Sequence, residues 1–226
     1  MSVILSLETS TDVCSVALRD GGELLAEEVL QEPQAHASRL APLIDNVINT
    51  SGAVLKDIDA VAISMGPGSY TGLRIGTSTA KGLCYALDIP LIAVGTLELM
   101  AYQGTLLNEM NAFLCPMIDA RRMEVYCLVA DQHLSIIQGV SARVVDEATF
   151  AELLEANKVL FFGNGAGKCR AVIQHPNALF LEGVSPMARA LGDIARKKFA
   201  AGEFEDLVAF KPLYLKEFVA KKPGKI

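Results

Sequence analysis

Residues 60–86 read AVAISMGPGSYTGLRIGTSTAKGLCYA, and this stretch decides the fold class. A short apolar run, typical of a buried strand, ends in a Gly-Pro-Gly turn that opens a helical segment at residues 71–87. Gly72, Gly76 and Ala80 recur at a spacing of four, so they lie along one face of that helix. Such a face allows a phosphate to approach its start or another helix to pack along its length.

The surrounding sequence alternates strand and helix patterns. Residues 3–7, 13–19 and 23–30 read as strands, and the Asp-Gly pair at 20–21 predicts a hairpin between the second and third. Strands at 60–64 and 90–94 and a helix from Thr96 give the order β-β-β-α-β-α-β-α. Residues 35–50 predict an amphipathic helix whose aliphatic stripe consists of Leu40, Leu43, Ile44, Val47 and Ile48.

The second half of the chain repeats this order in a shortened form. Strand patterns at 113–118, 124–130 and 135–145 precede a helix at 147–156, a strand at 159–162 and a helix at 187–201. We therefore predict an α/β protein with two related domains, at residues 1–106 and 107–226.

Composition restricts the function and the location. The 226 residues carry a net charge of −6, which argues against a surface that grips nucleic acid by bulk charge. No apolar run reaches the ~18 residues of a membrane span, and the cytoplasm is the expected location. The five cysteines and three histidines are scattered, so we expect buried free thiols and no metal site.

Two polar segments are candidate ligand contacts. Residues 7–12 (LETSTD) form a loop that could hold phosphate oxygens or could be a plain hairpin turn. Asp119, Arg121 and Glu124 cluster in a second turn, as a local ion-pair turn or as a charged patch facing a ligand. The candidate contacts for a nucleotide are Glu8, Ser10, Thr11, Asp119 and Arg121.

Two glycine-rich segments come close to phosphate-binding motifs without matching them. Residues 66–72 (GPGSYTG) lack the spacing of a dinucleotide fingerprint and the Gly-Lys-Ser/Thr ending of a P-loop. Residues 163–169 (GNGAGKC) mimic a P-loop, but the interval is one residue short and Cys169 replaces the hydroxyl. This second segment could be a structural turn or could contact a nucleotide, and the sequence leaves both interpretations open.

Together these motifs resemble the TsaB (YeaZ) family. The resemblance covers essentially the whole chain and rests on ILSLETSTDVCSVAL, HASRLAPLI, SMGPGSYTGLRIGTSTAKGLCYALDIPLIAV and MIDARRMEVY. It implies an actin-like, sugar-kinase-like fold with a cleft between two domains. It also implies work in the synthesis of N6-threonylcarbamoyladenosine, next to the anticodon of tRNAs that read ANN codons.

The resemblance implies a non-catalytic partner rather than an enzyme. TsaB proteins are partners of the transferase TsaD, which uses an adenylate made by TsaC, and the ATPase TsaE completes the assembly. TsaD carries a metal-binding His-x-x-x-His where this chain has Thr96 and Met100, and Glu8 stands where an aspartate is usual. The chain should hold no cofactor or metal of its own, with ATP or ADP at the complex interface left open.

The family associates through the first two helices of each partner. We therefore expect the isolated chain to form a homodimer and to use the same face to bind TsaD. We expect it to contact tRNA only indirectly. The expected interface residues are Leu40, Leu43, Ile44, Val47, Ile48, Gly72, Leu73, Gly76 and Ala80. The alternatives are an autonomous ATP-dependent phosphotransferase or ATPase of the same fold and, more remotely, a peptidase.

Overall fold

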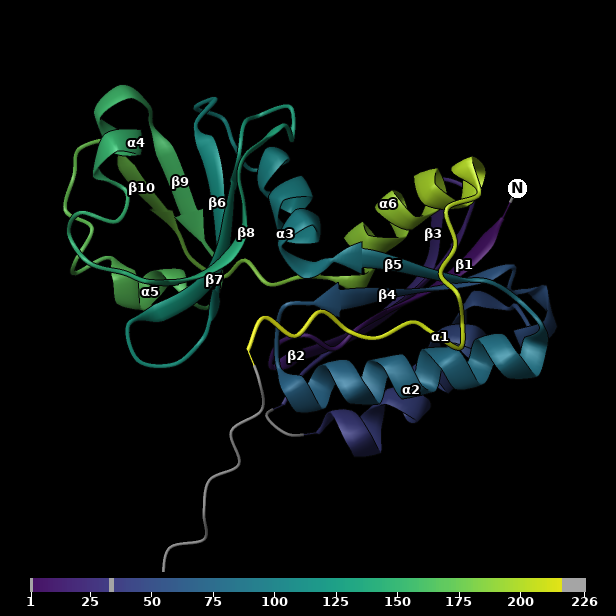
Figure 1. The fold of residues 1–226 in the computed structure, drawn as a ribbon. Coiled ribbons are helices and arrows are strands. Elements are labelled where there is room, and N and C mark those ends of the chain that lie inside the picture. Colours follow the sequence, from purple (N-terminus) through teal and green to yellow (C-terminus); the bar gives the residue numbers. More distant parts are fainter. Residues whose placement is uncertain (1, 33–34, 217–226) are drawn as a thin grey trace, which may run out of the picture.

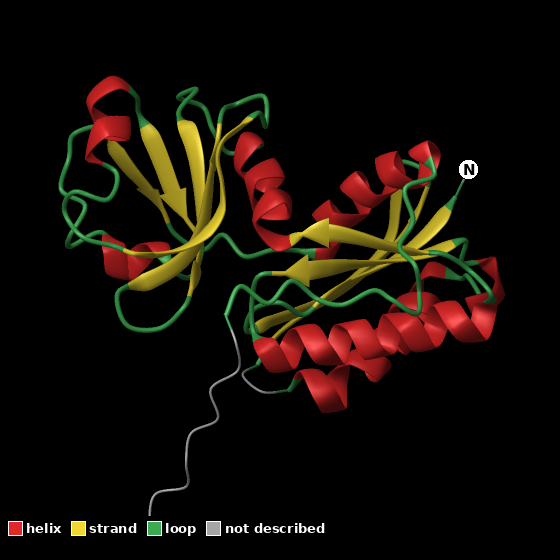
Figure 2. Cartoon of the chain, in the orientation of Figure 1, coloured by secondary structure: helices red, strands yellow, loops and turns green. Residues whose placement is uncertain are grey.

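The structure is a computed structural model that describes residues 2–32 and 35–216. Its strands form two separate five-stranded sheets, one in each half of the chain (Figures 1 and 2). The first sheet contains β1 (Val3–Glu8), β2 (Val13–Asp20), β3 (Glu23–Gln31), β4 (Ala60–Gly66) and β5 (Leu91–Gly95). The second contains β6 (Phe113–Asp119), β7 (Glu124–Ala130), β8 (Ile136–Val144), β9 (Val159–Phe162) and β10 (Ala178–Leu181).

The two sheets have the same topology. Their strand orders are β3-β2-β1-β4-β5 and β8-β7-β6-β9-β10. In each sheet the first three strands form an antiparallel meander, and the last two run parallel to the first. The parallel register of the first sheet places Leu5 opposite Val61 and Leu7 opposite Ile63. The predicted α/β class with two related halves is confirmed.

Helices cover both faces of the first sheet (Figure 1). On one face lie α1 (His36–Ser51) and α2 (Tyr70–Leu87), whose apolar sides join β2 and β4 in the largest core cluster. On the other lie α6 (Ala188–Ala201) and α3 (Thr96–Thr105), and α3 also packs on β6 of the second sheet. The short elements are a 3₁₀ turn (Leu55–Asp57), α4 (Ala151–Ala156) and α5 (Ala166–Cys169).

The division expected at residue 106 does not describe how the chain packs. The helix α6 belongs to the range 107–226 but covers the first sheet, where the Ala188 N–H donates to Ser15 Oγ at 2.9 Å. Arg19 of β2 pairs with Asp193 of α6 at 3.1 Å. The physical reason is the apolar face of the first sheet opposite α1 and α2, which Leu191 and Ala195 of α6 cover.

The five cysteines are free and buried, as expected. Within the described residues, no helix has the length and apolar character needed to cross a bilayer. In the same part of the chain, no group of three or more His, Cys, Asp or Glu side chains is arranged to hold a metal ion.

Candidate functional site

The small residues of α2 fit against the loop between β1 and β2. A Cβ on Gly72 would lie 2.0 Å from the Thr9 carbonyl oxygen, and one on Gly76 would lie 2.3 Å from Thr9 Oγ1. Thr9 Oγ1 donates to the Gly72 carbonyl at 2.9 Å, and the Ser69 N–H donates to the Ser10 carbonyl at 2.7 Å. Close packing therefore explains these glycines, but the neighbour is the chain's own first loop.

Glu8 is sealed beneath this loop. Its side chain is fully buried, and Oε1 accepts from the Ser10 N–H at 2.6 Å and Ser10 Oγ at 2.5 Å. Oε2 accepts from Ser64 Oγ of β4. Burial raises the pKa of the Glu8 carboxyl above its usual value of 4.5, although the three hydrogen bonds act in the opposite direction. The Glu8 carboxyl is thus occupied by hydrogen bonds and not presented to a ligand, contrary to the expectation for a nucleotide contact, and the Ser10 hydroxyl is occupied by Glu8.

The interface residues expected on α1 and α2 also face inward. Leu40, Leu43, Ile44, Val47 and Ile48 are buried, and all five belong to the core cluster between α1 and the first sheet. Gly72, Leu73, Gly76 and Ala80 are the buried side of α2. These nine residues therefore hold the domain together, because the apolar stripe of an amphipathic helix packs on the sheet beneath it.

The outer faces of the same two helices are exposed and lie side by side (Figures 1 and 2). Tyr85 is 84% exposed, and a Cβ on Gly82 would meet nothing within 4 Å. The exposed residues of α1 include Ala37, Arg39, Ala41, Asp45, Asn46 and Asn49, and those of α2 are Thr71, Arg74, Ser78, Gly82, Tyr85 and Ala86. We call these twelve residues the outer helical face.

A cavity of about 660 Å³ lies between the two halves of the molecule, and we call it the interdomain cleft. Its first wall is formed by residues 10–12 and 67–71, including the start of α2. Its second wall is formed by residues 118–122, Glu124, Tyr126 and Asn164 of the second half. Residues 213–216 complete the lining. Four of the five residues expected as nucleotide contacts, Ser10, Thr11, Asp119 and Arg121, therefore line this one cavity, and Glu8 does not.

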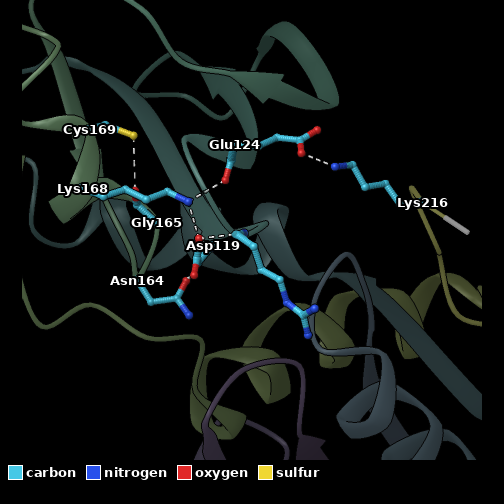
Figure 3. A network of polar contacts seen from close by, with 8 residues as sticks. Asp119, Glu124, Asn164, Gly165, Lys168, Cys169 and Lys216 are labelled. Atoms are coloured by element: carbon cyan, nitrogen blue, oxygen red, sulfur yellow. Dashed lines mark hydrogen bonds and ion pairs between the residues drawn. The ribbon is translucent and has the colours of Figure 1, made fainter. Parts of the chain in front are cut away.

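The P-loop-like segment that follows β9 is a structural turn (Figure 3). Lys168 Nζ bonds to the Asp119 carboxylate and donates to the Glu124 carbonyl at 2.7 Å. Asn164 Oδ1 accepts from the Asp119 N–H at 2.9 Å, and a Cβ on Gly165 would lie 2.8 Å from the Ile118 carbonyl carbon. The segment thus uses its lysine and its close backbone approach to hold the turn between β6 and β7.

The ion pairs of that turn involve lysines and do not lie within the expected cluster of Asp119, Arg121 and Glu124. Asp119 pairs with Lys168 and Glu124 pairs with Lys216, whereas Arg121 bonds to Asp119 through its backbone N–H at 2.9 Å. Arg121 and Arg122 have φ values of 70° and 50°, in the left-handed region that few side chains adopt. Within residues 2–32 and 35–216, neither guanidinium group has an ion pair, and both side chains line the interdomain cleft.

The segment after α6 crosses from the first half to the second. The Lys81 ammonium group of α2 donates to the backbone carbonyls of Val208 and Phe210, both at 3.2 Å. The Leu213 N–H donates to the Met65 carbonyl at 2.7 Å. The chain then reaches the cleft, where the centroids of the Tyr214 and Tyr70 rings lie 4.9 Å apart. Sequence reasoning missed Tyr126, Tyr214 and Lys216 as cleft residues, because no local pattern says where this segment runs.

The two positions expected from the sequence to correspond to the His-x-x-x-His of TsaD lie inside the protein. Thr96 and Met100, both on α3, are fully buried. Met100 packs among apolar side chains between α3 and the second sheet. A hydroxyl and a thioether are poor substitutes for two imidazole ligands of a hard metal ion.

Comparison with solved structures supports the fold. A Pseudomonas aeruginosa protein, described as similar to the peptidase YeaZ, matches with a TM-score of 0.84 and 30% identity over 96% of this chain and 100% of the other. The activator of 2-hydroxyisocaproyl-CoA dehydratase from Clostridium difficile matches with a TM-score of 0.52 at 10% identity, over 90% and 98% of the two chains. The two repeated sheets and these likenesses define a two-domain protein of the actin-like, sugar-kinase-like fold.

Comparison of sequences gives the family. The family model described as TsaD, tRNA N6-adenosine threonylcarbamoyltransferase, matches residues 23–223. The TsaB protein of Escherichia coli K12 is 32% identical over 98% of this chain and 99% of its own length. TsaB of Bacillus subtilis is 31% identical over 76% and 75% of the two chains. The chain belongs to the TsaB (YeaZ) family, and its role is in the biosynthesis of threonylcarbamoyladenosine in tRNA.

Proposed function

We propose that the chain is a non-catalytic partner and activator of TsaD in the synthesis of N6-threonylcarbamoyladenosine, next to the anticodon of tRNAs that read ANN codons. The observation that carries the non-catalytic part is the sealed first loop. Glu8 and Ser10 are hydrogen-bonded to one another, and Gly68 and Gly72 pack closely against the backbone carbonyls of the loop. Phosphoryl transfer needs groups that are free to contact phosphate and its metal ion, and Glu8 and Ser10 are not free.

The buried Thr96 and Met100 support the same conclusion for the transferase chemistry. A chain that lacks the two imidazoles at these positions contributes to the reaction through another subunit. We propose direct binding to TsaD, with TsaE in the same assembly, in the cytoplasm. The charge of −6 favours an arrangement in which partners hold most of the tRNA.

We propose the outer helical face as the surface for TsaD and, in the absence of TsaD, for a second copy of the chain. It presents the exposed ring of Tyr85, and exposed aromatic residues are frequent anchors of protein interfaces. Small side chains at Ser78, Gly82 and Ala86 leave a shallow path along α2 for a partner helix. This replaces the buried stripe of α1 and α2 as the association surface.

Reconstitution of tRNA modification from purified TsaC, TsaD and TsaE tests this function. The reaction is run with and without the chain, beside an assay of ATP hydrolysis by the chain alone. Loss of product when the chain is omitted, together with no hydrolysis by the chain alone, is expected. ATP hydrolysis or phosphotransfer by the isolated chain would favour the autonomous phosphotransferase instead, and peptide cleavage would favour the peptidase.

A further inference from the structure

The outer side of α6 is positively charged in a protein that is acidic as a whole. Four basic residues and one acidic residue give this helix a net charge of +3, whereas the whole chain carries −6. Three of the four basic side chains are exposed, at Arg189, Arg196 and Lys197. We call these three residues the α6 basic ridge.

Two cations of the ridge have no acidic partner in the described part of the chain. Asp193, the acidic residue of α6, pairs at 3.1 Å with the mostly buried Arg19 of β2, so its charge is neutralised from beneath the helix. Among residues 2–32 and 35–216, no ion pair includes Arg196 or Lys197. Lys197 Nζ lies 5.8 Å from the centroid of the Tyr102 ring on α3. Both charges are therefore available to an anionic partner.

The packing of α6 fixes where these charges lie. A Cβ on Gly192 would lie 2.9 Å from Arg19 Cδ, so the helix lies close against the first sheet. Arg189 and Arg196 are seven residues apart, which places them on the same side of the helix about 10 Å from each other. Arg189 shares its charge with Glu27 at 3.4 Å and is the weaker member. A row of cations on a rigid helix loses little freedom when it binds.

Aromatic side chains lie at the end of this ridge. The chain turns back after α6, where Lys198 pairs with Glu203 and the ring centroids of Phe199 and Phe204 lie 5.6 Å apart. Phe204 is 46% exposed. Cations beside exposed aromatic rings are typical of surfaces that bind RNA, because cations attract phosphates and rings stack on unpaired bases.

The ridge and the outer helical face lie on opposite sides of the first half. Figure 1 shows α6 on one face of the first sheet and α1 and α2 on the other. A partner that binds α1 and α2 therefore approaches from the side away from α6. One chain can use both surfaces at once.

We propose that the α6 basic ridge contacts the phosphate backbone of tRNA while the tRNA is modified. The inference rests on the proposed function, which brings the chain into an assembly that acts on tRNA. An arginine guanidinium presents several N–H donors in a fixed plane and matches the oxygens of a phosphate group. The net charge of −6 argues against binding by bulk charge, so the ridge adds a local contact to tRNA that partners mainly hold.

Binding of fluorescently labelled tRNA to the purified complex of the chain with TsaD tests the ridge, with anisotropy as the readout. The double change Arg196→Gln and Lys197→Gln should weaken binding at least about fivefold, because two phosphate contacts are lost. The plot of log binding constant against log salt concentration should become shallower by about 1 to 2, since fewer counterions are released. A purely structural role of the two residues would not change that slope.

The double change Lys56→Gln and Lys158→Gln is the matched control, because it removes the same charge from exposed positions on other elements. It should change the affinity by less than about twofold and leave the salt dependence unchanged. Circular dichroism and a thermal melt verify that each variant is folded. The proposal is overturned if the ridge variant binds tRNA with the affinity and salt dependence of the parent complex, or if the control loses as much affinity.

Copurification with TsaD separates this inference from the proposed function. The ridge variant should copurify with TsaD as the parent chain does. A ridge variant that copurifies and binds tRNA like the parent overturns the inference alone, whereas a parent chain that does not bind TsaD overturns the proposed function and the inference with it.

Vesicles of phosphatidylcholine and phosphatidylserine provide a second anionic surface. The chain should not bind them at the salt concentration at which the complex binds tRNA. Vesicle binding that requires Arg196 and Lys197, together with unchanged tRNA binding by the ridge variant, would assign the ridge to a membrane surface and contradict the proposal.

Discussion

Gly72 of α2 and Thr9 of the first loop are in direct contact, with the place of a Cβ on Gly72 only 2.0 Å from the Thr9 carbonyl oxygen. The Thr9 hydroxyl donates a hydrogen bond to the Gly72 carbonyl at 2.9 Å. The helix and the loop are therefore joined as one unit. This contact fixes the start of α2, which in turn forms one wall of the interdomain cleft.

Gly72→Ala should lower the free energy of unfolding by about 2–3 kcal/mol, because the new methyl group overpacks a site that backbone atoms enclose. Gly76→Ala should act in the same direction through its contact with Thr9 Oγ1. Gly82→Ala is the matched control, since a Cβ there meets nothing within 4 Å. It should raise the free energy of unfolding by about 1 kcal/mol through helix propensity. Denaturant unfolding measures all three, and equal effects at Gly72 and Gly82 would contradict the contact.

Glu8→Gln should change how stability depends on pH. Burial raises the pKa of Glu8, so the folded state binds this proton more tightly than the unfolded state. Its contribution to stability is complete below the usual pKa of 4.5 and is lost as the pH rises through the folded-state pKa. A glutamine has no such proton, so the variant should gain stability relative to the parent chain as the pH rises.

Denaturant unfolding at a series of pH values measures that difference, with Asp45→Asn on the exposed side of α1 as the control. If the free energy of unfolding varied with pH in the same way for the parent chain and for Glu8→Gln, the buried carboxyl would not retain its proton.

Gly82→Leu should weaken association without unfolding the chain, because the added side chain projects from the outer helical face into open space. We expect copurification with TsaD and self-association to fall at least about tenfold, as expected for a bulky side chain placed within a packed interface. Pull-down and light scattering after size exclusion measure the two effects.

Gly139→Leu is the control for this variant. Gly139 lies on β8 of the second sheet, is exposed, and also has nothing within 4 Å of the place of its Cβ. It should leave both forms of association unchanged. Normal association of a folded Gly82→Leu protein would place the partner elsewhere.

Lys168→Met should loosen the turn between β6 and β7, because Lys168 contacts both the Asp119 carboxylate and the Glu124 carbonyl (Figure 3). The pair is partly exposed, so we expect the free energy of unfolding to fall by only about 1 kcal/mol. Lys158→Met, at an exposed position with no side-chain bond to the described residues, should change it by much less. A loss at position 158 as large as that at position 168 would show that the bonds of Lys168 add nothing.

The order of the elements could be read from the sequence because it depends on local patterns. The Asp-Gly hairpin, the aliphatic stripe of α1 and the apolar run of β4 each specify their own element. Repetition of the same order in both halves then indicated two related sheets. The Ser69 side chain caps the start of α2 by accepting from the Gly72 N–H at 3.3 Å.

The direction in which each face points could not be read in the same way. An amphipathic stripe says that a face is buried but not whether a sheet or another subunit buries it. The stripe of α1 and the glycines of α2 were assigned to a partner, whereas β2, β3 and Thr9 bury them. The return of α6 to the first sheet likewise depends on contacts between residues far apart in sequence, such as Arg19 with Asp193.

The rate of threonylcarbamoyladenosine formation by TsaC, TsaD and TsaE, measured as the chain is titrated into the reaction, tests the central claim most directly. Formation should be negligible without the chain, rise with added chain and saturate, while Gly82→Leu restores much less activity than Gly139→Leu. An unchanged rate without the chain would contradict the account, as would ATP turnover by the chain alone at a rate comparable to that of the full reaction.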